Sequence, residues 1–123
     1  MIPLAFISGP LTSDDPQLMQ HRRVQAEAFG ATVRSECECY VFVPHTDISG
    51  PIGLHGEDLW AWAMGVCLSK LEHDADLIVM MPDWNRSRGS RLEHEHALTL
   101  GIPVAYNVDE AAAIVARLKE GAA

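Results

Sequence analysis

The chain has 123 residues, which is enough for one domain with a single hydrophobic core and too few for two. Hydrophobic residues make up 48% and charged residues 21%, as in packed globular domains, which excludes a disordered or collagen-like chain. With 17 acidic and 9 basic side chains the formal net charge is -8, so the overall field repels nucleic-acid polymers and anionic membranes.

Targeting signals and cysteine usage indicate a cytoplasmic protein. The longest apolar stretches, such as residues 77–82, are far shorter than the ~20 residues that span a bilayer, and the N-terminus lacks a signal-peptide pattern. The three cysteines, Cys37, Cys39 and Cys67, are an odd and small number, so disulfides are not expected. Cys37 and Cys39 lack the second pair that would complete a metal site, and we expect no metal or other cofactor.

The first half of the chain predicts two strands and two helices. Residues 2–8 are a short apolar run stopped by Gly9-Pro10, which predicts a buried strand and a sharp turn. Polar residues before Pro16 predict the start of a long helix that continues to Cys37, with Gly30 as its weak point. The next elements are a second buried strand, a turn-rich connection and a second helix, at residues 39–44, 45–56 and 57–73.

The second half repeats the alternation. The apolar run 77–81 predicts a third strand, and the segment 90–100, ended by Gly101, predicts a third helix. Residues 103–106 predict a fourth strand, and residues 109–119 predict a closing helix capped by Asp109.

Each predicted strand is almost continuously apolar, which is typical of a parallel sheet covered on both faces. We therefore expect one doubly wound, Rossmann-like α/β domain over residues 1–123, with a parallel sheet of four to five strands and helices on both faces. Ligands of such sheets bind at the carboxyl ends of the strands, so the candidate site lies in the segments 8–12, 45–56 and 83–90.

The segment from Pro82 to Glu93, between the third strand and the third helix, holds the most candidate site residues. Helix N-terminal amides, the close approach allowed by Gly89, the hydroxyls of Ser87 and Ser90 and nearby guanidinium groups predict a site for a small anion. The local pattern alone favours another interpretation, in which Ser90 and Glu93 form a Ser-x-x-Glu capping box. Glu95 points to another side of the helix, so the two carboxylates cannot form a catalytic pair.

Three other side chains were weighed as ligand contacts or metal ligands. His45 follows the second strand and could bind a base or carry a proton, although a loop histidine bonded to the backbone fits equally well. Trp84 follows a strand end and is a better stacking candidate than Trp60 or Trp62, which belong to a core or an interface. His94 and its neighbour two residues on diverge on a helix and are expected to be solvated.

Three motifs in this order resemble the nucleoside 2-deoxyribosyltransferase superfamily, over residues 2–106. They are Phe6-Ile7-Ser8-Gly9-Pro10, Ala75-Asp76-Leu77-Ile78-Val79, and Trp84-Asn85-Arg86-Ser87-Arg88-Gly89-Ser90-Arg91-Leu92-Glu93 followed by Ala97 and Gly101. The likeness is strongest to small, mostly uncharacterised phage and bacterial branches with "GW-x-x-SRGA-x-x-E". It is weaker to the 2'-deoxynucleoside 5'-phosphate N-hydrolases and the cytidylate N-glycosidases.

The resemblance implies roles for particular residues. Glu93 matches the glutamate that attacks the anomeric carbon, and Ser87 matches the serine that helps to hold a phosphate in the monophosphate hydrolases, where transferases of free nucleosides carry an acidic residue. Leu68 stands where relatives carry a supporting aspartate, and a loop residue would have to replace it. The residues expected to surround sugar, phosphate and base are Ser8, Gly9, Pro10, His45, Asp83, Trp84, Ser87, Arg88, Gly89 and Ser90.

The resulting expectation is an N-glycosidase that cleaves a nucleoside 5'-monophosphate with Glu93 as nucleophile. A deoxyribosyltransferase is the alternative of the same class, and a non-catalytic nucleotide-binding module, favoured by Leu68, is the alternative of another class. The expected partners are a small nucleotide or nucleoside and a second copy of the chain. The expected homodimer is built partly on the helix that carries Trp60, Trp62 and Met64, with shared active sites.

Overall fold

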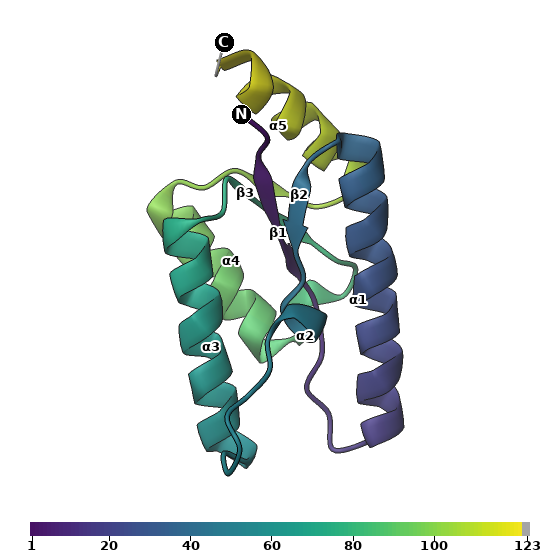
Figure 1. Ribbon diagram of the computed structural model, residues 1–123, viewed down its shortest axis with the longest axis vertical. Helices are drawn as coiled ribbons and strands as arrows, with labels where there is room; N and C mark the ends of the chain where they lie inside the picture. The colour runs from purple at the N-terminus through teal and green to yellow at the C-terminus, as the bar shows by residue number, and fades with distance from the viewer. Residues whose placement is uncertain (122–123) are drawn as a thin grey trace.

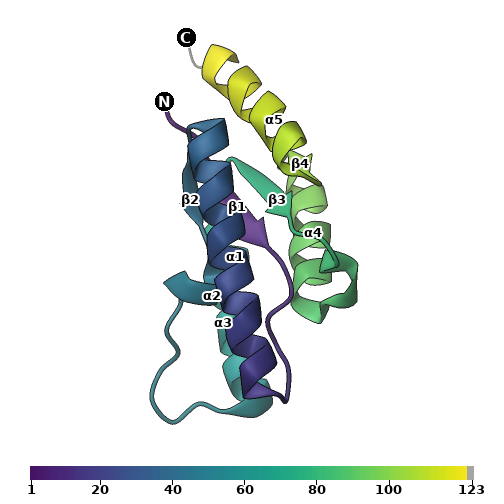
Figure 2. The same ribbon diagram turned by 90° about the vertical axis from the view of Figure 1, so that its right-hand side faces the viewer.

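The computed structural model describes residues 1–121 and forms a parallel sheet between two layers of helices (Figures 1 and 2). The strands run in the order β2-β1-β3-β4, and all neighbours are parallel. In chain order the elements are β1 (Leu4–Ser8), α1 (Pro16–Cys37), β2 (Tyr40–Phe42), α2 (Pro44–Asp47), α3 (Gly56–His73), β3 (Leu77–Met80), the 3-10 turn η1 (Trp84–Arg86), α4 (Arg88–Leu100), β4 (Val104–Ala105) and α5 (Val108–Gly121). The doubly wound α/β class expected from the sequence is confirmed.

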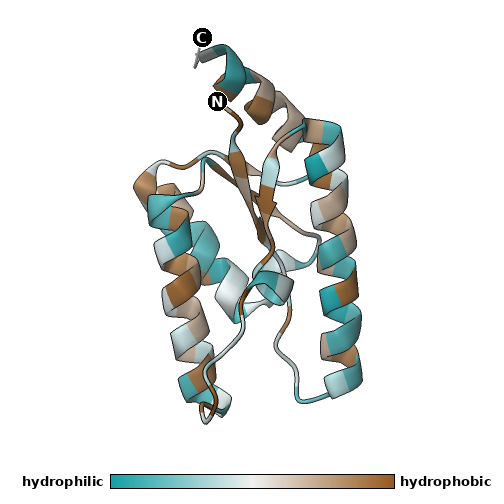
Figure 3. Ribbon diagram, viewed as in Figure 1, coloured by the Kyte–Doolittle hydropathy of each residue, from teal (hydrophilic) through white to brown (hydrophobic). Residues whose placement is uncertain are grey.

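Alternate side chains of the central strands enter two separate hydrophobic cores. Ala5 and Ile7 of β1 pack with α1 and α5, whereas Phe6 packs on the opposite face with α3 and α4. Because both faces are covered, β1 and β3 are apolar along nearly their whole length, as Figure 3 shows for β1. No helix within residues 1–121 is long and apolar enough to cross a bilayer.

The boundaries of several elements differ from those predicted. The expected second buried strand is shorter, and it lies at the sheet edge with Tyr40 59% exposed. The connection after it contains the short helix α2, in which the Asp47 carboxylate accepts a hydrogen bond from the Val43 amide at 2.7 Å. The closing helix is capped by Asn107 rather than by Asp109, because the Asn107 carbonyl accepts from the Glu110 amide.

Two glycines act as the sequence predicted, or close to it. Gly101 ends α4 in the left-handed conformation, with φ of 75°. Gly30 is buried inside α1, where an added Cβ would lie 2.7 Å from a methyl group of Val43. The predicted weak point of α1 is therefore the place where that helix packs most closely against the segment after β2.

Candidate active site

The N-terminus of α4 is capped by Ser87, whose hydroxyl accepts a hydrogen bond from the Ser90 amide at 3.2 Å. The helix therefore begins at Arg88, two residues earlier than predicted. The Ser90–Glu93 capping box favoured by the local pattern is wrong, because Ser90 lies inside the helix and the Glu93 side chain bonds elsewhere. The capping role falls to a residue that the sequence analysis assigned to phosphate binding.

Glu93 projects from α4 to the carboxyl end of the central strand β1. Its side chain is only 6% exposed, and Ser8, the last residue of β1, donates a hydrogen bond from Oγ to Glu93 Oε1 at 2.6 Å. The partners are 85 residues apart in the sequence and are brought together because α4 packs over the strands. The first and third motifs of the resemblance thus meet at one buried carboxyl group.

A third polar group at this carboxyl comes from α3. The Cys67 thiol hydrogen-bonds to Glu93 and is buried among α3, α4 and the sheet. Burial raises the pKa of Glu93 to about 7, while the hydrogen bonds from Ser8 and Cys67 oppose part of that rise. The sequence analysis missed Cys67, although helical spacing from Met64 and Leu71 places it on the buried face of α3.

Leu68, the next residue on α3, faces away from this group. It lines a separate small cleft with Leu92, Glu95, His96 and Thr99, on another side of α4 from Glu93. The substituted position is therefore not the α3 residue that contacts the carboxyl. None of the four suggested replacements, Asp47, Asp58, Asp83 and His45, is hydrogen-bonded to Glu93 among the described residues.

Ser90 adds a second buried hydroxyl on the face of α4 that carries Glu93. The residue is 1% exposed, and its Oγ has no hydrogen-bond partner within residues 1–121. Gly89 beside it is packed closely, because an added Cβ would lie 3.1 Å from Met64 Sδ. A buried hydroxyl without a partner is costly, and a bound polar ligand would satisfy it.

Arg88 points away from the Ser87–Ser90 backbone and toward α3. Its Nη1 lies 2.7 Å from Glu57 Oε1, and its guanidinium stacks over the Trp60 ring at 3.6 Å. Both charged side chains are more than half exposed, so the ion pair contributes little stability by itself. Arg88 must leave Glu57 before it can contact a phosphate.

His45 lies in α2 at the end of β2 and is buried against the β1–α1 loop. Its Nε2–H donates to the Pro10 carbonyl at 3.0 Å, while Nδ1 is buried and has no partner within the described part of the chain. Desolvation lowers the pKa of His45, so the ring is neutral at pH 7. The backbone-bonded alternative considered for this histidine is the arrangement found.

Trp84 and Asp83 lie on the outer side of the loop before α4. The Trp84 ring packs against His94 with ring centroids 4.3 Å apart, and His94 shares a hydrogen bond of 2.8 Å with the Tyr106 hydroxyl. Asp83 is exposed and adopts a left-handed backbone with φ of 64°. Stacking on a ligand would therefore compete with the contacts that Trp84 makes within the chain.

A family model for a domain of unknown function, DUF4406, matches residues 4–106. The chain belongs to the DUF4406 family. The matched segment runs from β1 to the residue after β4, so it includes Ser8, Cys67, Ser87 and Glu93. A search of curated proteins found no significant match.

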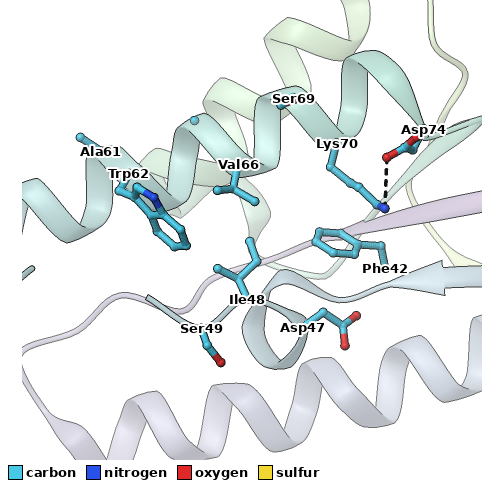
Figure 4. A pocket seen from close by; sticks show the side chains of 11 residues that line it. Phe42, Asp47, Ile48, Ser49, Ala61, Trp62, Val66, Ser69, Lys70 and Asp74 are labelled. Carbon is cyan, nitrogen blue, oxygen red and sulfur yellow. Dashed lines mark ion pairs between the residues drawn. The ribbon is translucent and has the colours of Figure 1, made fainter. Parts of the chain in front are cut away.

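The largest groove on this DUF4406 domain lies on another side of α3 from Glu93 (Figure 4). It has a volume of about 800 Å³ and runs between α3, which supplies Trp62 and Val66, and the segment after β2, which supplies Ile48. At one end Lys70 pairs with Asp74 at 3.1 Å. The expected homodimer through α3 stays a prediction: Trp62 lines this open groove, whereas Trp60 is covered by Arg88.

Gly9 is expected to be intolerant of a side chain. A Cβ at this position would lie 2.5 Å from Met81 Sδ and 2.9 Å from Met81 Cβ, so the Ser8–Pro10 turn would have to shift. We expect Gly9→Ala to destabilise the domain by about 1–3 kcal/mol, measured by urea unfolding. Gly65→Ala is the matched control, because nothing lies within 4 Å of its added Cβ and alanine favours a helix. Equal stability of the two variants would contradict the steric argument.

Proposed function

We propose that this protein is an N-glycosidase that cleaves the bond between base and sugar in a nucleoside 5'-monophosphate, with Glu93 as nucleophile. The observation that carries the proposal is the buried Glu93 carboxyl, hydrogen-bonded to Ser8 at the carboxyl end of the central strand. A carboxyl group is rarely buried without a salt-bridge partner unless its reactivity is used. The order and spacing of the motifs that resemble the deoxyribosyltransferase superfamily support the same role.

The proposed reaction has two displacements at the anomeric carbon. The Glu93 carboxylate forms a bond to C1' as the base leaves with the electron pair of the glycosidic bond. Water then attacks C1', loses a proton and releases Glu93, which gives the sugar phosphate with retained configuration. The Ser8 hydroxyl and the Cys67 thiol stabilise the ionised carboxylate that the first step requires. A second base in place of water would make the protein a transferase.

The start of α4 supplies the proposed phosphate contacts. Ser87 carries no charge, whereas a carboxylate at this position would repel a dianionic phosphate. Backbone amides of the first turn and the free Ser90 hydroxyl are donors for an anion, and the helix dipole adds to their effect. Arg88 joins them once it has left Glu57.

A second candidate function is nucleotide binding without catalysis. It is favoured by the closure of the site, because the Glu93 side chain is 6% exposed and the largest groove lies elsewhere. A panel of nucleosides and nucleoside 5'-monophosphates, assayed by mass spectrometry for released base, separates the alternatives. Hydrolysis predicts base and sugar phosphate, and transfer predicts a new nucleoside only when a second base is present. Tight binding without any product would favour the binding module.

The phosphate should determine which substrates are used. We expect a cleaved monophosphate to have a kcat/KM at least about tenfold above that of its nucleoside, since each charge-assisted hydrogen bond contributes about 1.5–3 kcal/mol. Ser87→Asp should penalise the nucleotide by like-charge repulsion and affect the nucleoside little. Aspartate is also a good N-cap, so the substitution preserves the start of α4.

Ser87→Asn is the matched control for that substitution, because asparagine caps equally well and adds no charge. Steady-state kinetics and competition by inorganic phosphate measure the effect. Equal use of nucleotide and nucleoside, with no phosphate competition, would contradict the phosphate site and favour a transferase of free nucleosides.

A further inference from the structure

We propose that Cys67 is a positioning residue for Glu93, and that its thiol donates a hydrogen bond that fixes the carboxylate opposite Ser8. The proposal deepens the function proposed above and rests on Glu93 being the nucleophile. The supporting aspartate that the resemblance implies is absent at Leu68, and Cys67 supplies a different group from the neighbouring position of the same helix.

Cys67 and Ser8 approach the carboxyl from different elements. Ser8 belongs to β1 and donates to Oε1 at 2.6 Å, whereas Cys67 belongs to α3, which packs along α4. Both side chains are buried, at 1% exposure for Ser8 and 4% for Cys67, so water does not easily replace either donor. A carboxylate held from a strand on one side and a helix on the other loses the freedom to rotate, which favours attack along one line.

The thiol acts as a donor and not as a second nucleophile. Burial, the nearby Glu93 charge and the hydrogen bond between them all raise the pKa of Cys67, so the sulfur keeps its proton. Ser8 does not titrate in the working range. Among the groups that face Glu93, neither Ser8 nor Cys67 therefore changes charge near pH 7, and a titration in that range reports on Glu93 itself.

Leu68 provides the contrast within the same helical turn. Its side chain lines the cleft with Leu92 and His96, away from Glu93, although it is also partly buried. Truncation at Leu68 perturbs the packing of α3 without removing a donor from the carboxyl. The two adjacent positions thus separate a hydrogen-bond effect from a general packing effect.

The test compares Cys67→Ala and Cys67→Ser, with Leu68→Ala as control. The Glu93 carboxyl carbon is followed through its titration by NMR and assigned by its loss in Glu93→Gln. Loss of the donor in Cys67→Ala should raise the titration midpoint of Glu93 by roughly one pH unit, because a donor to the charged form is removed. Cys67→Ser, which keeps a donor, should restore most of the shift, and Leu68→Ala should leave the midpoint unchanged.

Activity provides the second readout. The pH at which kcat/KM reaches half its plateau should move upward with the NMR midpoint in Cys67→Ala and return in Cys67→Ser. Cys67→Val fills the site better than alanine and serves as the donor-free variant if Cys67→Ala does not fold.

Three results would overturn the role of Cys67: an unchanged midpoint in the donor-free variant, an equal shift in Cys67→Ser, or an equal shift in Leu68→Ala. The titration is independent of turnover. Failure of the glycosidase proposal would instead appear as an absence of product from the unmodified protein, whatever the midpoint.

Discussion

Glu93→Gln should lower the turnover of a cleaved nucleotide by a factor on the order of 10³ or more. The amide cannot form the bond to C1', because it carries no negative charge and is a poor nucleophile. Its oxygen can still accept the hydrogen bond from Ser8, so the fold and most of the affinity for the ligand should remain. Base release under saturating nucleotide measures turnover, and equilibrium binding of the same nucleotide measures affinity.

Glu95→Gln is the matched control for this substitution. Glu95 lies on the same helix two residues away, is exposed, and faces a separate cleft. This variant should keep the activity of the unmodified protein. If Glu93→Gln also retained turnover, Glu93 would not be the nucleophile and the proposed mechanism would be wrong.

The second large effect concerns stability and pH. The pKa of Glu93 rises from 4.5 to about 7 on folding, so the folded state binds more protons than the unfolded state between these values. The free energy of unfolding should therefore fall as pH rises through this window, with the full contribution present below about pH 4.5 and lost above pH 7. The shift corresponds to about 3 kcal/mol.

Urea unfolding of the unmodified protein and of Glu93→Gln at pH 5 and pH 8 measures this effect. The variant lacks the titrating group, so its stability should fall less with rising pH, and the difference between the two proteins should change by about 3 kcal/mol. His45 has a lowered pKa and contributes with the opposite sign, but it is present in both proteins and cancels in the difference. A difference that does not change with pH would show that Glu93 ionises in the fold as it does in water.

The sequence by itself determined the fold class and the identity of the central carboxylate. Continuous apolar runs such as residues 77–81 can be buried on both faces only in a covered parallel sheet, so local pattern and tertiary environment agree. Glycine and proline mark chain reversals through backbone restrictions that act within a few residues, which is why Gly101 was placed correctly. Glu93 was selected by its spacing within a motif.

Only the tertiary structure decided what surrounds that carboxylate. Ser8, Cys67 and Glu93 come from a strand and two helices, and no local pattern records which face of α3 meets α4. The same limit explains the wrong capping box, because the choice between Ser87 and Ser90 depends on where the chain turns after β3. Hydrogen bonds across many residues form when packing brings the elements together, so the partners of a buried carboxyl follow from the packing rather than from the spacing.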